Sequence, residues 1–184
     1  MTAIVKTKID DRGARLLLRR LVRNSENIRP ALNDIMGDLL SSIDENFQKQ
    51  GRPKRWTPLK PGSIRQRRKK QQSGTKILQA SGLLASSING KVQGDSKITI
   101  GSPLPYARIH DQGGTFTHPG GTKFKIVGPG KAKFVKNSAT KFNGITKPHQ
   151  ITIPKRPFLM FQRKDLKEAE KVLADHLLSG VKQK

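Results

Sequence analysis

The sequence predicts an α+β fold, in which two amphipathic helices pack against a small, mostly antiparallel β-sheet. Three observations lead to this prediction. Apolar stripes at helical spacing occupy residues 26–50 and residues 165–179. Short alternating segments bounded by glycine and proline lie between the two stripes, as is typical of strands. The 184 residues suffice for a single domain, 1–184, but a hydrophobic content of 33% indicates that arms or loops lie outside its core.

The N-terminal residues 1–24 are predicted to form an arm with a short amphipathic helix. Its leucines Leu17, Leu18 and Leu21 share one side of that helix. The remaining surface carries Arg12, Arg15, Arg19, Arg20 and Arg23. Two interpretations stay open, because these arginines suit either a solvated helix face or an arm that reaches a phosphate or a neighbouring subunit.

Residues 26–50 give the clearest helix, because apolar residues recur at spacings of three and four. Ser25 or Asn27 is expected to cap its start, Pro30 is tolerated in its first turn, and Gly51 is expected to end it. The stripe consists of Ile28, Leu32, Ile35, Met36, Leu39, Leu40, Ile43 and Phe47.

The last helix is predicted over residues 165–179. Asp165 is expected to cap it with Glu168 in the capping-box position, and Gly180 is expected to end it. Its apolar stripe consists of Leu166, Ala169, Leu173 and Leu177. The two helices together supply one side of the predicted core.

The predicted sheet is built from about 91–101, 106–110 and 150–153. Residues 91–101 are expected to form a hairpin with its turn at Gly94-Asp95. Before it, 77–90 is read as a short helical unit that buries one side, made of Leu78, Leu83, Leu84 and Ile88. Residues 106–110 follow two prolines, so a short helix or an extended turn is also open for them.

Residues 52–76 change character, since they hold many basic residues and no acidic one. They are predicted to form an extended, exposed arm with only Trp56 and Leu59 docked, because unpaired buried charges are costly. The densest basic cluster is Arg65, Arg67, Arg68, Lys69 and Lys70. A solvated loop is the simpler interpretation of this cluster, and a surface for DNA or for a protein partner is the functional one.

Residues 113–150 are read as a loop and hairpin insertion. Lys123 and Lys125 alternate with Phe124 and Ile126, and after a turn at Gly128–Lys131 the lysines Lys131 and Lys133 alternate with Ala132 and Phe134. This pattern predicts one apolar and one cationic face. No acidic residue occurs between Asp111 and Asp165, which indicates a surface that faces phosphates.

The charge balance predicts a polyanionic partner. The chain has 37 Lys+Arg against 13 Asp+Glu, a formal net charge of +24. Nucleic acid is the first candidate, followed by an anionic membrane or an acidic protein surface. The absence of cysteine excludes disulfides and thiolate metal sites. No signal peptide is expected, and no apolar run approaches the length that spans a bilayer. Of the candidate polyanions, nucleic acid and protein are the predicted partners, and a membrane is not.

No catalytic constellation is found in the sequence, so the chain is not expected to be an enzyme, and no cofactor or metal ligand is predicted. The histidines 110, 118, 149 and 176 are scattered and lie in no metalloprotease motif. A metal-dependent nuclease would be the best enzymatic alternative. Residues predicted to act as structural anchors are Trp56, Tyr106, His110, Pro157 and Phe158.

Several motifs together carry a resemblance. Ile100-Gly101, Pro105-Tyr106-Ala107, Ile109-His110 and Gly113-Gly114 resemble the central signature of the virion morphogenesis, or tail completion, family of tailed phages. Asp111 and Gln112 stand where Gln and Phe are usual. Further similar pieces occur in the family's order: Trp56-Thr-Pro-Leu59, Ile77–Leu83 followed by Ser87-Ile88, Ile153–Leu159 with Lys155 in place of alanine, and Asp165.

The resemblance spans about residues 28–178 and implies a structural protein of the phage neck or tail top that works in head–tail joining. By analogy with tail-tube symmetry, a homo-oligomeric ring, with a hexamer favoured, is expected around non-specific double-stranded DNA in the channel. The implied neighbours are connector and tail-terminator proteins, in a virion assembled in the host cytoplasm. The insertion lies where the family varies most. The alternative is a basic nucleic-acid-binding protein of the ribosomal-protein type.

Overall fold

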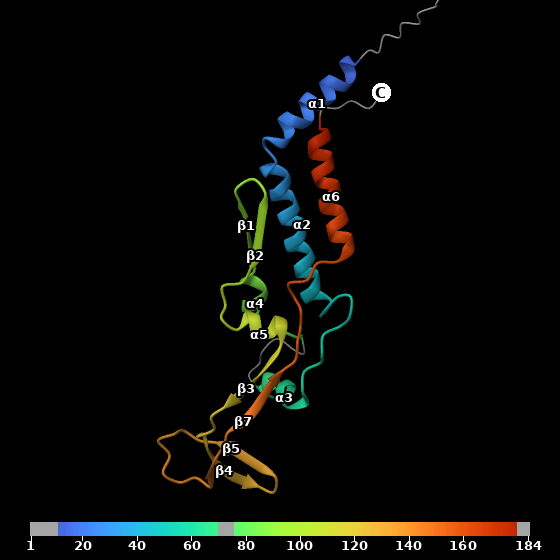
Figure 1. Ribbon diagram of the computed structural model, residues 1–184. Coiled ribbons are helices and arrows are strands. Elements are labelled where there is room, and N and C mark those ends of the chain that lie inside the picture. The colour runs from blue at the N-terminus through green and yellow to red at the C-terminus, as the bar shows by residue number, and fades with distance from the viewer. Residues whose placement is uncertain (1–10, 70–75, 180–184) are drawn as a thin grey trace, which may run out of the picture. The chain divides into compact units, whose positions relative to one another are not determined.

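The computed structural model describes residues 11–69 and 76–179 (Figure 1). It mixes helices with small antiparallel sheets, which confirms the predicted fold class. The chain divides into two compact units. The first combines the described residues up to Leu104 with those from Phe158 onward, and the second spans Pro105–Pro157.

In the first unit, the long helix α2 (Arg29–Gln48) packs against helix α6 (Arg163–Leu178) and against the hairpin of β1 (Asn89–Gln93) and β2 (Lys97–Gly101) (Figure 1). Every residue of the predicted α2 stripe is buried or half-buried. The hairpin and its turn are also confirmed.

The start of α2 differs from the prediction. Neither Ser25 nor Asn27 is its N-cap, because the helix begins after Ile28, whose side chain makes no capping bond. Pro30 in the first turn has no N–H and therefore leaves one group fewer to cap. The helix ends two residues before the predicted end, at Gln48 with Lys49 as its C-cap. Gly51 turns the chain after it at φ +110°, and a Cβ there would lie 2.7 Å from the Lys54 carbonyl oxygen. Only glycine fits this position.

Helix α6 begins two residues earlier than predicted. Gln162 is its N-cap, and the Gln162 N–H donates to Asp165 Oδ2 at 2.6 Å in a reciprocal capping box. Asp165 therefore serves at the third helical position, and Glu168 is exposed. Leu166 is exposed as well, because it lies off the face that meets α2. Ser179 is the C-cap, and the predicted stop at Gly180 lies outside the described residues.

Helix α1 (Arg12–Ser25) precedes α2 and contacts α6. The contact is made at its C-terminal end, where Asn24 Nδ2 donates to the carbonyl oxygens of Leu177 at 2.9 Å and His176 at 3.3 Å. These are among the carbonyls that a helix end leaves without partners. No residue of α1 is buried, and Leu18 and Val22 are each 60% exposed.

Two segments of the first unit form short helices. Helix α3 (Pro61–Lys69) lies within the basic arm, so the prediction of an extended conformation is wrong there. Proline is favoured at a first helical position, and arginine, glutamine and lysine propagate helices well. Helix α4 (Leu83–Ser86) has 4 residues and buries Leu84 while leaving Leu83 exposed. Leu83 therefore does not share the predicted buried side.

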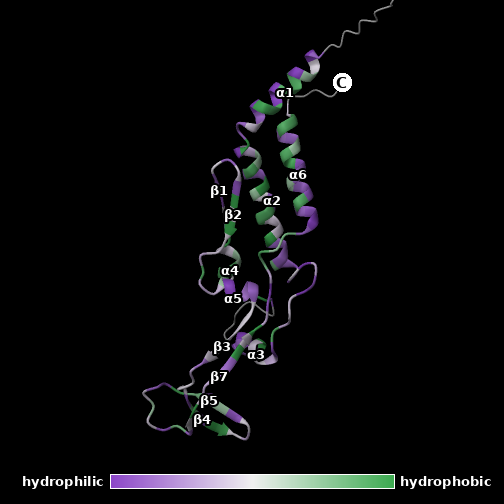
Figure 2. Ribbon diagram, viewed as in Figure 1, coloured by the Kyte–Doolittle hydropathy of each residue, from purple (hydrophilic) through white to green (hydrophobic). Residues whose placement is uncertain are grey.

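The core of the first unit centres on Phe47. Its ring meets Trp56 edge-on at 5.6 Å between centroids and Phe158 at 5.4 Å, and Phe158 is fully buried. Figure 2 shows hydrophobic segments recurring along α2. Within the arm Trp56 is buried and Arg52 and Leu59 are half-buried, so the prediction that only Trp56 and Leu59 are docked is wrong for Arg52. The arm becomes exposed from Lys60 onward among the described residues, apart from the half-buried Ile64 and Arg67.

A buried polar network lies beside this core. Arg52 donates to Glu45 Oε2 at 2.6 Å, to Asn46 Oδ1 at 2.8 Å and to Ser42 Oγ at 2.6 Å. Ser42 Oγ donates to Asp165 Oδ2 at 2.5 Å. Burial raises the pKa of Asp165, but the bonds from Ser42 and the Gln162 N–H outweigh it, so that pKa is lowered overall. The network joins α2 to the start of the arm and to α6.

The second unit contains helix α5 (Ala107–Gln112), a ribbon and a small sheet. Strand β3 (Gly114–His118) pairs with β7 (His149–Ile153). The three-stranded sheet has the order β5 (Lys131–Phe134), β4 (Lys123–Gly128), β6 (Gly144–Ile145).

The predicted single sheet is therefore corrected. Residues 106–110 belong to the start of a helix rather than to a strand, because two prolines interrupt the chain ahead of them. Residues 150–153 pair with β3 and form no sheet with the 91–101 hairpin. Gly113, at φ +73° and tight against Lys155, sends the chain from α5 into β3.

Candidate interaction surfaces

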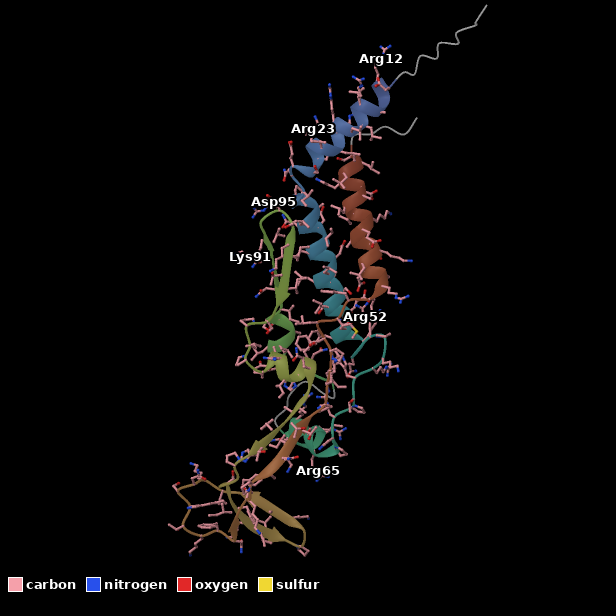
Figure 3. All side chains as sticks on the ribbon, viewed as in Figure 1. Arg12, Arg23, Arg52, Arg65, Lys91 and Asp95 are labelled. Atoms are coloured by element: carbon pink, nitrogen blue, oxygen red, sulfur yellow. The ribbon has the colours of Figure 1, made fainter. Side chains whose placement is uncertain are left out.

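The first candidate surface is helix α3. It places Arg65, Arg68 and Lys69 in exposed positions, and Figure 3 labels Arg65 on it. Arg67 is half-buried, and its Nη1 donates to the Lys76 carbonyl oxygen at 2.6 Å. Lys70 lies outside the described residues. The helix thus presents three exposed cationic side chains, whereas Arg67 is bound to Lys76.

The second candidate surface is the β4–β5 hairpin of the second unit. Its register pairs Lys125 with Lys133 on one face. The opposite face pairs Phe124 with Phe134 and Ile126 with Ala132. The alternation predicted from the sequence is therefore present in the strand pairing. Lys131 is exposed and pairs with Gly128 where the register shifts.

Lys123 differs from the other lysines of this hairpin. Its Nζ donates to the carbonyl oxygens of Asn137 at 2.7 Å and Ala139 at 3.2 Å, and it lies 4.7 Å from the centre of the Phe142 ring. These contacts tie the loop after β5 to β4. The sequence spacing places Lys123 with Lys125 on the predicted cationic face. In the structure, Lys123 instead binds the loop after β5.

The apolar face of the hairpin is exposed at its outer end. Phe134 is 69% exposed and Ile126 is 57% exposed, whereas Phe124 is half-buried against Gly144. The hairpin thus exposes a cationic face and an apolar face at the same time, which makes it a candidate interaction surface.

The structure places the predicted anchors as follows. Trp56 and Phe158 are buried, and Pro157 is half-buried. Tyr106 is 39% exposed, and its ring meets the edge of the His110 ring at 6.0 Å. Burial, assisted by the positive charge of Arg156, lowers the pKa of His110. His110 Nδ1 is buried and has no hydrogen-bond partner in the described part of the chain.

One arrangement could not be read from the sequence. His118 and His149 are cross-strand partners at the end of the β3–β7 ribbon, and their rings stack at 5.0 Å. Only the strand register brings these two positions together. Within residues 11–69 and 76–179, no group of three or more histidine, cysteine or acidic side chains could hold a metal ion. No helix in these same ranges is long and apolar enough to cross a membrane.

Comparisons with known proteins show what this chain is similar to. A sequence profile described as the phage virion morphogenesis family matches residues 9–178. The Mu-like prophage FluMu G protein 2 of Haemophilus influenzae is 34% identical over 97 residues, which cover 53% of this chain and 61% of that relative. No solved structure matches.

Proposed function

This chain belongs to the phage virion morphogenesis family, and we propose that it forms a ring at the phage neck or tail top that joins head to tail around the DNA. The family establishes a role in virion assembly. The neck position, the ring and the DNA channel are the proposal. Its support is the ordered set of family motifs together with the cationic surfaces of both units.

One observation carries the proposal: the cross-strand pair of Lys125 and Lys133. Directly opposed side chains in an antiparallel pair have Cβ atoms about 5 Å apart, and like charges there are destabilising. No ion pair within the described residues relieves either lysine, and no acidic residue occurs in the sequence between Asp111 and Asp165. A bound polyanion would remove this repulsion, so the hairpin is suited to phosphates.

The residue types also suit DNA that slides. Lysine is a hydrated point charge on a flexible stem, whereas arginine makes geometrically defined bidentate contacts. Phosphate contacts carry no sequence information by themselves. A ring that places Lys125, Lys131 and Lys133 toward its lumen would therefore hold DNA without fixing its register, and the exposed apolar face would hold each hairpin to the ring wall.

The test replaces Lys125, Lys131 and Lys133 by glutamine together and leaves Lys123 in place because of its structural contacts. Lys164, Lys167 and Lys171 on α6, also replaced by glutamine, give a control with the same change of charge. We expect normal oligomers by light scattering and loss of DNA retention in finished particles for the hairpin variant only. Normal DNA retention would exclude the channel role, and failed joining with normal oligomers would indicate an acidic protein ring as the partner.

A second experiment distinguishes the proposed ring from the alternative of a nucleic-acid-binding protein of the ribosomal-protein type. Gel filtration with light scattering on the wild-type protein is expected to show a closed oligomer. A monomer that shifts on RNA would instead favour the alternative, because RNA-binding modules work as single domains on single strands and helices.

A further inference from the structure

Helix α1 carries a row of exposed arginines. Arg12, Arg15, Arg19 and Arg23 follow one another at spacings of three and four, so they form a single row along the helix. Figure 3 labels Arg12 and Arg23 at the two ends of this row. The row runs from Arg12 to Arg23, a rise of about 16 Å along the helix.

Helix α2 carries a row of the opposite sign on its outer face. Asp34, Asp38, Ser41 and Glu45 also follow one another at spacings of three and four, again over about 16 Å. Asp34, Asp38 and Ser41 are exposed, and a Cβ placed at the neighbouring Gly37 would meet no atom within 4 Å. This face of α2 is therefore open.

The two rows cannot meet within one chain. Helix α2 follows α1 directly after Glu26–Ile28, and the C-terminal end of α1 is held on α6 through Asn24. From that contact α1 runs on past the end of α6 (Figure 1). Its arginines therefore extend away from Asp34 and Asp38 of the same chain.

We infer that the arginine row of α1 docks antiparallel on the outer face of α2 in a second copy of this chain. In that arrangement Arg23 faces Asp34 and Arg19 faces Asp38. The two contacts form together because the two arginines are four residues apart on α1 and the two aspartates are four residues apart on α2. No ion pair within the described residues already occupies these four side chains. Arg15, which pairs with Asp11 at 2.7 Å on the surface, falls beside the exposed Ser41.

The charge distribution favours a second copy as the occupant. The outer face of α2 has no basic residue between Pro30 and Gln48, in a chain whose net charge is +24. An acidic row on so basic a molecule reduces the repulsion between copies only if a cationic surface of the next copy lies on it. The exposed Leu18 and Val22 flank the arginine row and add apolar area to the contact.

The contact uses two different surfaces, so it is heterologous and repeats from copy to copy. Such contacts close into rings or continue as filaments, depending on the rotation between copies. The inference therefore deepens the proposed function and rests on its claim that copies associate. It adds the helices and the residue pairs through which they do so.

Charge reversal on each side tests the contact. One variant carries Arg19→Glu and Arg23→Glu, and the other carries Asp34→Arg and Asp38→Arg. Each variant alone opposes like charges, so both are expected to be monomeric by light scattering. An equal mixture restores opposite charges at every contact and is expected to assemble again. Circular dichroism should show unchanged folding, since all four side chains are exposed.

Matched controls lie on the exposed face of α6. Lys167→Glu with Lys171→Glu, and Glu168→Arg with Asp175→Arg, change the net charge equally and are expected to leave assembly unchanged. If the wild type assembles and the single variants assemble as well, or their mixture stays monomeric, the contact is wrong while the ring survives. If the wild type itself is monomeric, both the contact and the ring fail.

Discussion

Arg52 shows how one side chain can link three parts of the chain. It meets groups of α2 at three points, and through Ser42 it reaches Asp165 of α6. The sequence places Arg52 at the start of an exposed basic arm, and nothing in its neighbours marks it as docked. The sequence held one indication of a partner for Arg52. Ser42 and Asn46 are polar residues on the buried side of α2, and buried polar groups need hydrogen-bond partners.

Replacing Arg52 by alanine should lower the free energy of unfolding by about 2–4 kcal/mol, since it leaves buried acceptors without a donor. Lys49→Ala is the matched control, because Lys49 also binds Glu45 but does so in solvent. Its effect should be much smaller, as exposed ion pairs contribute little. Urea unfolding of both variants measures the difference, and equal losses would contradict this role of Arg52.

His110 should make stability depend on pH. Its folded-state pKa lies below the unfolded value of about 6.5, because burial and Arg156 disfavour the charged ring. The unfolded chain therefore binds the proton more readily, so stability is complete above the unfolded pKa and declines as pH falls toward the folded one. His110→Gln should weaken this decline in urea unfolding measured between about pH 7 and pH 5. An unchanged pH dependence in the variant would contradict this role of His110.

Helix ends and turns were only partly predictable at the scale of elements. The α2 stripe and the Gly94-Asp95 turn are local patterns, so the sequence suffices for them. The partner of 150–153 depends on contact with β3, which lies far away in the chain, so spacing alone could not identify it. The exposure of Leu166 could not be predicted for the same reason, because it depends on which side of α6 faces α2, and local spacing does not determine that.

Two glycines of the α2 region should respond oppositely to alanine. Gly51→Ala places a methyl group 2.7 Å from backbone atoms at φ +110° and should cost at least about 2 kcal/mol of unfolding free energy. Gly37→Ala has open space in the helix interior and should add about 0.5–1 kcal/mol. Thermal unfolding of the two variants compares them directly. A destabilising Gly37→Ala would mean that this face of α2 is covered in the folded protein.

Two neighbouring lysines of strand β4 should also behave differently. Lys123→Gln removes the bonds to Asn137 and Ala139, so the loop after β5 should lose protection in amide hydrogen exchange. Lys125→Gln removes only one member of an opposed like-charged pair and should leave that loop protected. Equal loss of protection in both variants would show that the loop depends on the overall charge of the strand.

At the scale of the whole molecule, charge should dominate binding to DNA. Affinity for non-specific duplex is expected to fall steeply with salt, because each neutralised phosphate contributes about −0.9 to the slope of log K against log salt. The hairpin variant with Lys125, Lys131 and Lys133 replaced by glutamine should flatten this slope, and the α6 control should not. Fluorescence anisotropy on duplexes of unrelated sequence provides the measurement, and a strong sequence preference would contradict phosphate-based binding.

The family could be predicted from the order of the sequence motifs, whereas the roles of individual surface residues could not. Trp56 and Phe158 lie in two of those motifs, and both rings contact Phe47 in the core. The lysine alternation was also visible, but the separate role of Lys123 depends on a loop that folds back in space.

The position of β5 has a further consequence, for solubility. In the order β5-β4-β6, β5 is an edge strand, and it ends at the exposed Phe134. An uncovered edge with an apolar face is a template for intermolecular strand pairing. Lys131 and Lys133 on that strand act as gatekeepers, since their mutual repulsion keeps two such edges apart. We therefore expect the same charges that are proposed to bind a polyanion also to protect free subunits from aggregation.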